Sequence, residues 1–371
     1  MPIHDPLAAV PGARCRRVVV KVLVTGSAGF IGSHVVDALV DAGVDVLSID
    51  ALHPAAHTGE PPYLNPQADH VWADVRDESA LRGLVSGVDA VCHQASMVGL
   101  EPSFADVSDY VGHNDLGTAR LLSSLYATGF RGPLVLASSM VVYGEGAYRC
   151  DVHGNVRPGP RDPARMALGR FDPGCPECES PLTPIPVMED ARTDPRSVYA
   201  ATKLHQEHLC ASFERATNAP VIALRYHNVY GPRMPRNSSY SGVAAIFRSA
   251  LEEGLAPQVF EDGRQLRDFV HVSDVAAANV LALTADPPVA GVCNIAGGAP
   301  TTVYRMAEMV ADGVGAEALA PQITGTWRPG DVRHIIGSPQ RAADVLDWRG
   351  EIDLEVGMKE FASDPLREIS V

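Results

Sequence analysis

The segment VLVTGSAGFIG, residues 22–32, constrains the fold of this chain more than any other stretch. An apolar, β-branched run precedes Gly26, Gly29 and Gly32, and an amphipathic helical pattern follows them. A second apolar run, VDVLSID, then ends in Asp50. A strand, a glycine-rich turn, a helix and a second strand within about 30 residues form a β-α-β unit. The segment therefore predicts a parallel sheet, because parallel strands need a crossover connection of this kind.

The glycine spacing is typical of a turn that binds a dinucleotide, although a plain glycine-rich turn is the alternative. Such glycines let the backbone approach a pyrophosphate, whose oxygens accept from free N–H groups at the helix start. Asp50 is predicted to bind the adenosine ribose hydroxyls. No Arg or Lys follows it in DALHPAAH to meet a 2′-phosphate, so NAD is favoured over NADP. The predicted cofactor-binding residues of this region are Gly26, Gly29, Phe30, Ile31, Gly32, Asp50, Asp74, Val75 and Ala95.

Asp74 and Val75 belong to this set because they lie where a third strand would end, near the adenine; an exposed turn is the alternative. Apolar runs at 88–96 and 132–140 alternate with helical patterns such as LGTARLLSSLYATGF. This alternation predicts an α/β fold with a Rossmann-type, doubly wound parallel sheet. The expected organisation is a flexible extension at 1–17, a Rossmann domain at 18–225 completed by about 268–296, and a smaller, mostly helical C-terminal substrate lobe at 226–267 and 297–371.

Composition excludes several classes of protein. The formal net charge of −15 argues against nucleic-acid binding, which needs a basic surface. No stretch approaches the ~18 to 20 apolar residues of a membrane span. The N-terminus lacks the apolar core of a signal peptide, and seven cysteines are too few for a disulfide scaffold. These features predict a cytoplasmic protein with reduced thiols and no membrane partner.

Tyr199 and Lys203 in SVYAATK are four residues apart, which places both on one face of a predicted helix. A surface pair would have the same spacing. However, Ser138 and Ser139 end the apolar run at 132–140, and ligands bind at the carboxyl ends of parallel strands. The two segments together predict a catalytic site.

Five motifs occur in order: TGxxGxxG, SSxxVYG, YxxxK, RYHNVYGP and RDFVHVSDVA. Over residues 20–345 the chain resembles the extended short-chain dehydrogenase/reductase superfamily, in its nucleotide-sugar epimerase/dehydratase branch. The resemblance implies that Tyr199 is the acid/base, that Lys203 is its partner and binds the nicotinamide ribose, and that Ser139 assists. A phenol pKa of about 10 is too high for a base at neutral pH, so a nearby positive charge must favour the phenolate.

The resemblance also narrows the reaction. The 4,6-dehydratases of the branch carry Asp and Glu after the assisting hydroxyl, where this chain has Met140 and Val141. Met140 and Val141 cannot perform the acid and base steps of a dehydration. The remaining chemistry is reversible hydride transfer at one carbon, which implies a 4-epimerase. A UDP-hexose 4-epimerase, a reductase that releases its cofactor and a silent NAD-binding sensor are the alternatives. The family also implies a homodimer formed through the helix that bears Tyr199.

Three residues are expected to bind the nucleotide sugar. Asn228 matches a family asparagine that meets the sugar pyrophosphate, and Arg267 and Arg328 match arginines that hold the phosphates. Two arginines would supply the local positive field that the acidic chain lacks. The alternatives are a structural salt bridge for Arg267 and a surface position for Arg328.

Residues 145–193 interrupt the α/β alternation with a segment rich in Pro, Gly and Arg. Cys150, His153, Cys175 and Cys178 form two C-x-x-H/C pairs, the spacing of a zinc ribbon or knuckle. A structural zinc ion is the favoured interpretation, with free thiols and a redox dithiol as alternatives. The segment also resembles one found in dTDP-L-rhamnose 4-epimerases, which implies a dTDP-6-deoxyhexose as the substrate.

Overall fold

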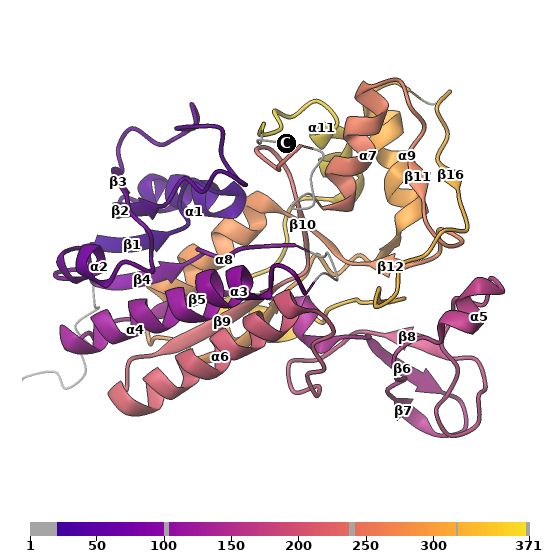
Figure 1. Ribbon diagram of the computed structural model, residues 1–371, viewed down its shortest axis with the longest axis horizontal. Coiled ribbons are helices and arrows are strands. Elements are labelled where there is room, and N and C mark those ends of the chain that lie inside the picture. The colour runs from indigo at the N-terminus through magenta and orange to yellow at the C-terminus, as the bar shows by residue number, and fades with distance from the viewer. Residues whose placement is uncertain (1–20, 100–103, 237–241, 317, 369–371) are drawn as a thin grey trace, which may run out of the picture.

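The computed structural model describes residues 21–99, 104–236, 242–316 and 318–368, so the extension expected at 1–17 lies outside the described residues. Its centre is a seven-stranded parallel sheet in the order β14-β9-β5-β4-β1-β2-β3 (Figure 1). This confirms the predicted α/β fold. The strands are β1 (Lys21–Thr25), β2 (Asp45–Asp50), β3 (Asp69–Trp72), β4 (Ala90–His93), β5 (Leu134–Ser139), β9 (Val221–Tyr226) and β14 (Gly291–Ile295).

Helices cover both faces of this sheet. On one face α1 (Phe30–Asp41) packs against α8 (Val272–Thr284), and buried apolar side chains of both helices join one core. On the other face α2 (Glu78–Leu84), α4 (Gly117–Ala127) and α6 (Val198–Thr217) bury a second core (Figure 1). A short helix, α3 (Val107–Tyr110), and a π-helical turn at Val111–Leu116 lead into α4. Strand order reverses between β1 and β4, which opens a crevice at the carboxyl ends of these strands.

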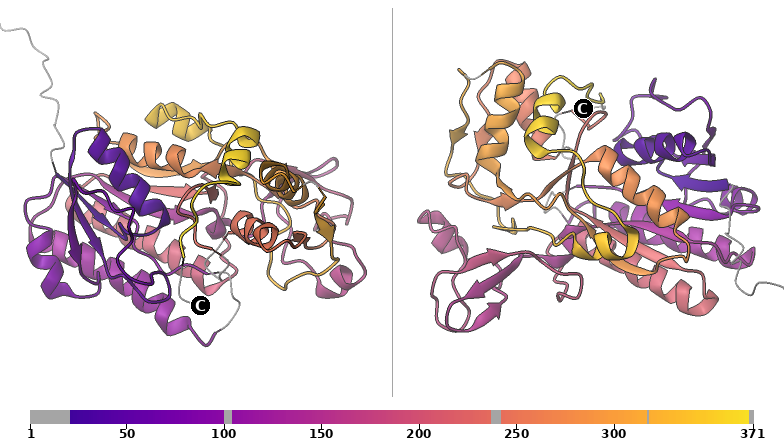
Figure 2. Two further views of the ribbon diagram at one scale, coloured as in Figure 1. Left: turned by 90° about the horizontal axis from the view of Figure 1, so that it is seen from above. Right: turned by 180° about the vertical axis from the view of Figure 1, so that it is seen from behind.

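The C-terminal lobe lies beside the carboxyl edge of the sheet (Figures 1 and 2). Its helices α7 (Val243–Glu252), α9 (Val303–Gly313) and α11 (Leu354–Phe361) enclose a core of their own, and α10 (Gln340–Leu346) packs near β14. Six short strands form three two-stranded pairs in this region: β10 (Asn228–Tyr230) with β13 (Phe269–His271), β11 (Gln258–Val259) with β16 (Gln322–Ile323), and β12 (Leu266–Arg267) with β15 (Thr301–Thr302).

The segment at 145–193 forms a small projecting arm, seen at the lower right of Figure 1. A 3-10 turn at Met140–Tyr143 connects it to β5. Three antiparallel strands in the order β7-β6-β8 build its sheet: β6 (Ala147–Cys150), β7 (Gly154–Val156) and β8 (Thr183–Ile185). One helix, α5 (Pro163–Ala167), lies between β7 and β8 in the chain.

Within the described ranges, none of the helices has both the length and the apolar character needed to cross a lipid bilayer.

Candidate active site

The turn between β1 and α1, here called the glycine cradle, contains Gly26, Gly29 and Gly32 and requires glycine for its backbone geometry. Gly26 has φ +67°, and a Cβ there would lie 2.6 Å from Ala95 N. A Cβ at Gly32 would lie 2.1 Å from Gly26 O, so α1 could not approach the turn with any larger residue. No side chain caps the start of α1, and its first turn carries no acidic residue. The first amides of α1 are therefore free to bind an anion.

Asp50 ends β2 beside this cradle and is held by the backbone. Its Oδ2 accepts from Ala28 N at 2.9 Å, and its Oδ1 accepts from Leu52 N at 2.8 Å. These two bonds fix the carboxylate while each oxygen keeps a lone pair for another donor. This geometry suits a ribose that presents two hydroxyl groups.

A cavity of about 390 Å³ joins the cradle to the carboxyl ends of β4, β5 and β9. Its lining includes every residue that the sequence assigned to the cofactor, together with the predicted catalytic residues and Asn228. Arg267 and Arg328 do not line it. The shape, the uncapped helix and the Asp50 carboxylate together fit a dinucleotide such as NAD, which would be held by Gly26, Gly29, Phe30, Ile31, Gly32, Asp50, Asp74, Val75, Ala95 and Lys203.

Ser139, Tyr199 and Lys203 meet inside this cavity. Ser197 caps α6 by accepting from Ala200 N at 3.1 Å, which starts the helix just before Tyr199. Lys203 follows one turn later, and its Nζ lies 5.9 Å from the centre of the Tyr199 ring. Lys203 Nζ donates to Ala137 O at 2.9 Å, so the side chain is tied to β5, the strand that ends at Ser139.

The electrostatics of this group follow from burial. Burial raises the pKa of the Tyr199 phenol, and a hydrogen bond with Ser139 opposes the rise. Burial lowers the pKa of Lys203 to about 7, against the attraction of Glu207. An ammonium group this close to neutrality can gain or lose its charge at physiological pH. The pair is therefore placed to exchange a proton with a bound hydroxyl group.

A set of buried hydrogen bonds supports the elements that carry Ser139, Tyr199 and Lys203. His93 Nδ1 lies 2.7 Å from Thr25 Oγ1, and His93 Nε2 lies 2.9 Å from Thr118 Oγ1. Burial lowers the pKa of His93 to about 3, so the ring stays neutral. Asn114 is buried and donates to Thr202 Oγ1 at 2.9 Å. Sequence reasoning missed His93, because its role depends on partners from two other elements, β1 and α4.

Arg367 is a second residue that sequence reasoning missed. The C-terminal segment pairs with Pro235 and brings Arg367 into the same cavity as Asp50 and His57. Its Nε and Nη1 are buried, with no hydrogen-bond partner among the described residues. No Arg or Lys follows Asp50 in DALHPAAH, and the fold supplies a cation from the C-terminal segment.

The three predicted substrate residues occupy different settings. Asn228 lines the cavity, and its Oδ1 is buried with no partner in the described part of the chain. Arg267 donates to three backbone carbonyls: Leu266 O at 2.8 Å, Arg333 O at 3.0 Å and Val332 O at 2.8 Å. These bonds leave two of its five N–H groups uncommitted. Arg328 lies over the Phe260 ring, 5.0 Å from its centre.

The sequence profile described as "NAD dependent epimerase/dehydratase family" matches residues 22–163 and 176–296. The chain belongs to this family. It is therefore an NAD-dependent enzyme of the extended short-chain dehydrogenase/reductase fold, as predicted.

Individual relatives agree with this assignment. A dTDP-L-rhamnose 4-epimerase of Burkholderia thailandensis is 36% identical, over 92% of this chain and 93% of its own. The structure of a UDP-glucose 4-epimerase from Thermotoga maritima with UDP-glucose has a TM-score of 0.74 at 29% identity, covering 92% and 97% of the two chains. A Thermus thermophilus UDP-glucose 4-epimerase in complex with NAD has a TM-score of 0.71 at 28% identity, covering 92% and 98%.

Proposed function

We propose that the chain is a nucleotide-sugar 4-epimerase that works through a transient 4-keto sugar. The observation that carries this proposal is the meeting of Ser139, Tyr199 and Lys203 in the cavity beside the glycine cradle. Met140 and Val141 follow Ser139 in the 3-10 turn and have no ionisable group. They cannot protonate a leaving hydroxyl or remove a C5 proton, as a 4,6-dehydration would require.

In this mechanism Tyr199 exchanges a proton with the C4 hydroxyl of the sugar. Lys203 supplies a positive charge that favours the phenolate. Ser139 donates a hydrogen bond to the same sugar oxygen as it becomes a carbonyl. When bound, NAD supplies the acceptor and donor of the hydride at C4. Tyr199 returns its proton once the hydride has come back to the other face, so no net oxidation results.

We assign the sugar pyrophosphate to Asn228, Arg267 and Arg328. Asn228 lines the cavity, where its Nδ2 amide can donate to a phosphate oxygen, and Arg267 keeps two N–H groups for an anion while its other donors fix its plane. Arg328 lies on a different loop. Its side chain would have to move from the Phe260 ring toward the phosphates to bind them together with Asn228 and Arg267.

We propose a dTDP-6-deoxyhexose such as dTDP-L-rhamnose as the substrate. The 36% identity to the Burkholderia thailandensis epimerase over 92% of this chain supports this choice. The second candidate is a UDP-hexose, because structures named UDP-glucose 4-epimerase also match over 92% of this chain. We also propose a homodimer through α6, which light scattering after size-exclusion chromatography would test.

Cofactor stoichiometry tests the reaction type. An epimerase converts many equivalents of sugar with a catalytic amount of NAD, and absorbance of NADH stays flat in the steady state. A reductase consumes one reduced cofactor for each sugar converted, and that result would replace the epimerase assignment.

A further inference from the structure

Four possible metal ligands converge in the arm at 145–193. Sγ of Cys150, Nδ1 of His153, Sγ of Cys175 and Sγ of Cys178 all lie within 4.8 Å of one another. No cysteine in the described ranges forms a disulfide, and the Cys150 and Cys178 sulfurs are 3.8 Å apart, far beyond the ~2.05 Å of an S–S bond. Three thiols and one imidazole thus form a single compact group, the ligand tetrad.

Three separations within the ligand tetrad are close to those of a tetrahedral zinc site. With Zn–S of about 2.3 Å and Zn–N of about 2.05 Å, a tetrahedron has sulfur–sulfur edges of about 3.8 Å and sulfur–nitrogen edges of about 3.6 Å. The Cys150–Cys178 edge is 3.8 Å. His153 Nδ1 lies 3.7 Å from Cys150 Sγ and 3.5 Å from Cys175 Sγ. These three separations match the edges of such a tetrahedron, and all four atoms lie within 4.8 Å of one another.

The backbone around the ligand tetrad also suits thiolates. Cys150 ends β6 and pairs with Gly154, so the first two ligands lie on a tight hairpin turn. Cys175 lies on a second turn, which the Gly174–Pro181 bridge closes. The amides of Val152 and His153 hydrogen-bond to the Cys150 sulfur. Those of Glu177 and Cys178 do the same for Cys175. Such N–H groups stabilise negative charge on sulfur.

The outer part of the arm has only a small apolar core, in which Tyr148, Met166 and Phe171 are buried. The apolar cluster at its base consists of Val142, Tyr143, Val187 and Ile335, with partly buried neighbours, and contains no residue from 148 to 186. A segment with so small a core is commonly stabilised by a disulfide or a metal. The match to the family profile omits residues 164–175, so this part is an addition to the common fold.

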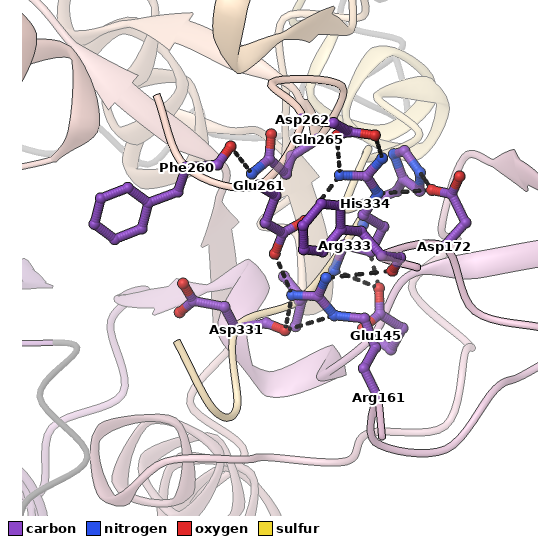
Figure 3. Close-up of polar contacts among 12 residues, drawn as sticks. Glu145, Arg161, Asp172, Phe260, Glu261, Asp262, Gln265, Asp331, Arg333 and His334 are labelled. Carbon is purple, nitrogen blue, oxygen red and sulfur yellow. Dashed lines mark hydrogen bonds and ion pairs between the residues drawn. The ribbon is translucent and has the colours of Figure 1, made fainter. Parts of the chain in front are cut away.

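The arm also makes ion pairs and hydrogen bonds with the edge of the substrate lobe (Figure 3). Asp172, three residues before Cys175, accepts from Nε of the fully buried Arg333 at 2.7 Å. Arg161 pairs with Glu261 at 2.7 Å and donates to Asp331 O at 2.7 Å. The carbonyls of residues 332 and 333 accept from Arg267, so the same edge orients an arginine that the proposed function assigns to the pyrophosphate.

We propose that Cys150, His153, Cys175 and Cys178 bind one structural zinc ion, and that this ion holds the arm against residues 331–336 of the lobe. All four coordination positions are taken by protein, so the ion has no open position for catalysis. Its role is to fix Asp172 and Arg161 where they stabilise the Arg333 segment.

Metal content tests the first half of the proposal. The chain is purified under reducing conditions without chelators or metal-affinity resin and analysed by mass spectrometry. We expect about one zinc per chain, and its loss in Cys178→Ser, a mild change at an exposed side chain. Cys210→Ser, at a buried thiol on α6 away from the ligand tetrad, should retain zinc. A metal-free wild type with reduced thiols, a different metal, or zinc retained by Cys178→Ser would overturn the assignment.

Hydrogen exchange tests the second half without measuring turnover, so its outcome is independent of the proposed function. Residues 331–336 should exchange at least several-fold faster after zinc is removed by a chelator. Asp172→Ala with zinc bound should reproduce part of this increase, whereas Asp190→Ala, at an exposed acid of the same arm, should not. Unchanged exchange at 331–336 in both the zinc-free and the Asp172→Ala protein would refute the coupling.

Discussion

Lys203 Nζ lies 5.9 Å from the centre of the Tyr199 ring and 2.9 Å from Ala137 O. Both side chains are buried, and the lysine joins α6 to β5, the strand that carries Ser139. Burial raises the pKa of the phenol, so in the proposed mechanism the charge of Lys203 is needed to favour the Tyr199 phenolate near neutral pH.

Replacement of the proposed acid/base should abolish turnover without loss of cofactor. We expect Tyr199→Phe to lower kcat by about 10²–10⁴-fold, the range for loss of a general acid/base. NAD binding should be little changed, because the cradle and Asp50 are untouched. Tyr126→Phe, at an exposed tyrosine, is the control. Turnover that survives in Tyr199→Phe would remove Tyr199 from the mechanism.

The buried lysine should make stability depend on pH. Burial lowers the pKa of Lys203 from 10.5 to about 7. Between these values the unfolded chain binds the extra proton, so the free energy of unfolding rises with pH. Relative to Lys203→Met at equal cofactor loading, wild type should gain on the order of 3 kcal/mol between about pH 7 and about pH 9.5. A difference that stays constant over this range in denaturant titrations would show that the lysine pKa is not lowered.

Arg367 should contribute to cofactor affinity. Two of its nitrogens are buried without partners in the cavity that Asp50 lines, and charge-assisted bonds to phosphate contribute about 1.5–3 kcal/mol. Arg367→Ala should therefore weaken NAD binding about 10- to 100-fold. Calorimetric titration against Arg82→Ala, at an exposed arginine of α2, would measure the change. Unchanged NAD affinity would exclude a contact with the cofactor's diphosphate, and a loss for NADP alone would place Arg367 at the 2′-phosphate.

The glycine cradle offers a test with a matched control. Gly32→Ala places a Cβ 2.1 Å from Gly26 O and should cost about 1–3 kcal/mol of stability while weakening NAD binding. Gly83→Ala lies in α2 with nothing within 4 Å of the new Cβ, and should stabilise by about 0.5–1 kcal/mol. Thermal melts would measure the stability of both variants, and NAD titrations would measure their affinity for the cofactor. Equal behaviour of the two would mean that the turn is not closely packed.

Local patterns account for what the sequence could predict. The β-α-β unit around Gly26 and the pair Tyr199 and Lys203 depend on spacing within single elements, which periodicity reveals. The strands of the arm could not be predicted, because β6, β7 and β8 span only 3 to 4 residues each in a Pro- and Gly-rich segment.

Long-range contacts account for the rest. Arg367 reaches the cofactor cavity only after the C-terminal segment has paired with Pro235. The ion-pair group around Arg333 joins the arm, the lobe and the loop at 261–262, and no periodicity links these segments. Arg267 was expected to hold phosphates, and two of its three bonds to backbone carbonyls depend on the position of residues 332 and 333.

The most direct test of the central claim is NMR of a reaction with dTDP-L-rhamnose, a catalytic amount of NAD and the purified chain. A 4-epimerase predicts conversion to an equilibrium mixture of the two C4 epimers, with no 4,6-dehydration product and no net NADH. If only UDP-glucose and UDP-galactose interconverted, the substrate would be a UDP-hexose instead of a dTDP-6-deoxyhexose. The assignment of the reaction as 4-epimerisation would stand. No C4 epimer from any dTDP- or UDP-sugar in a panel, with NAD bound, would contradict the epimerase account.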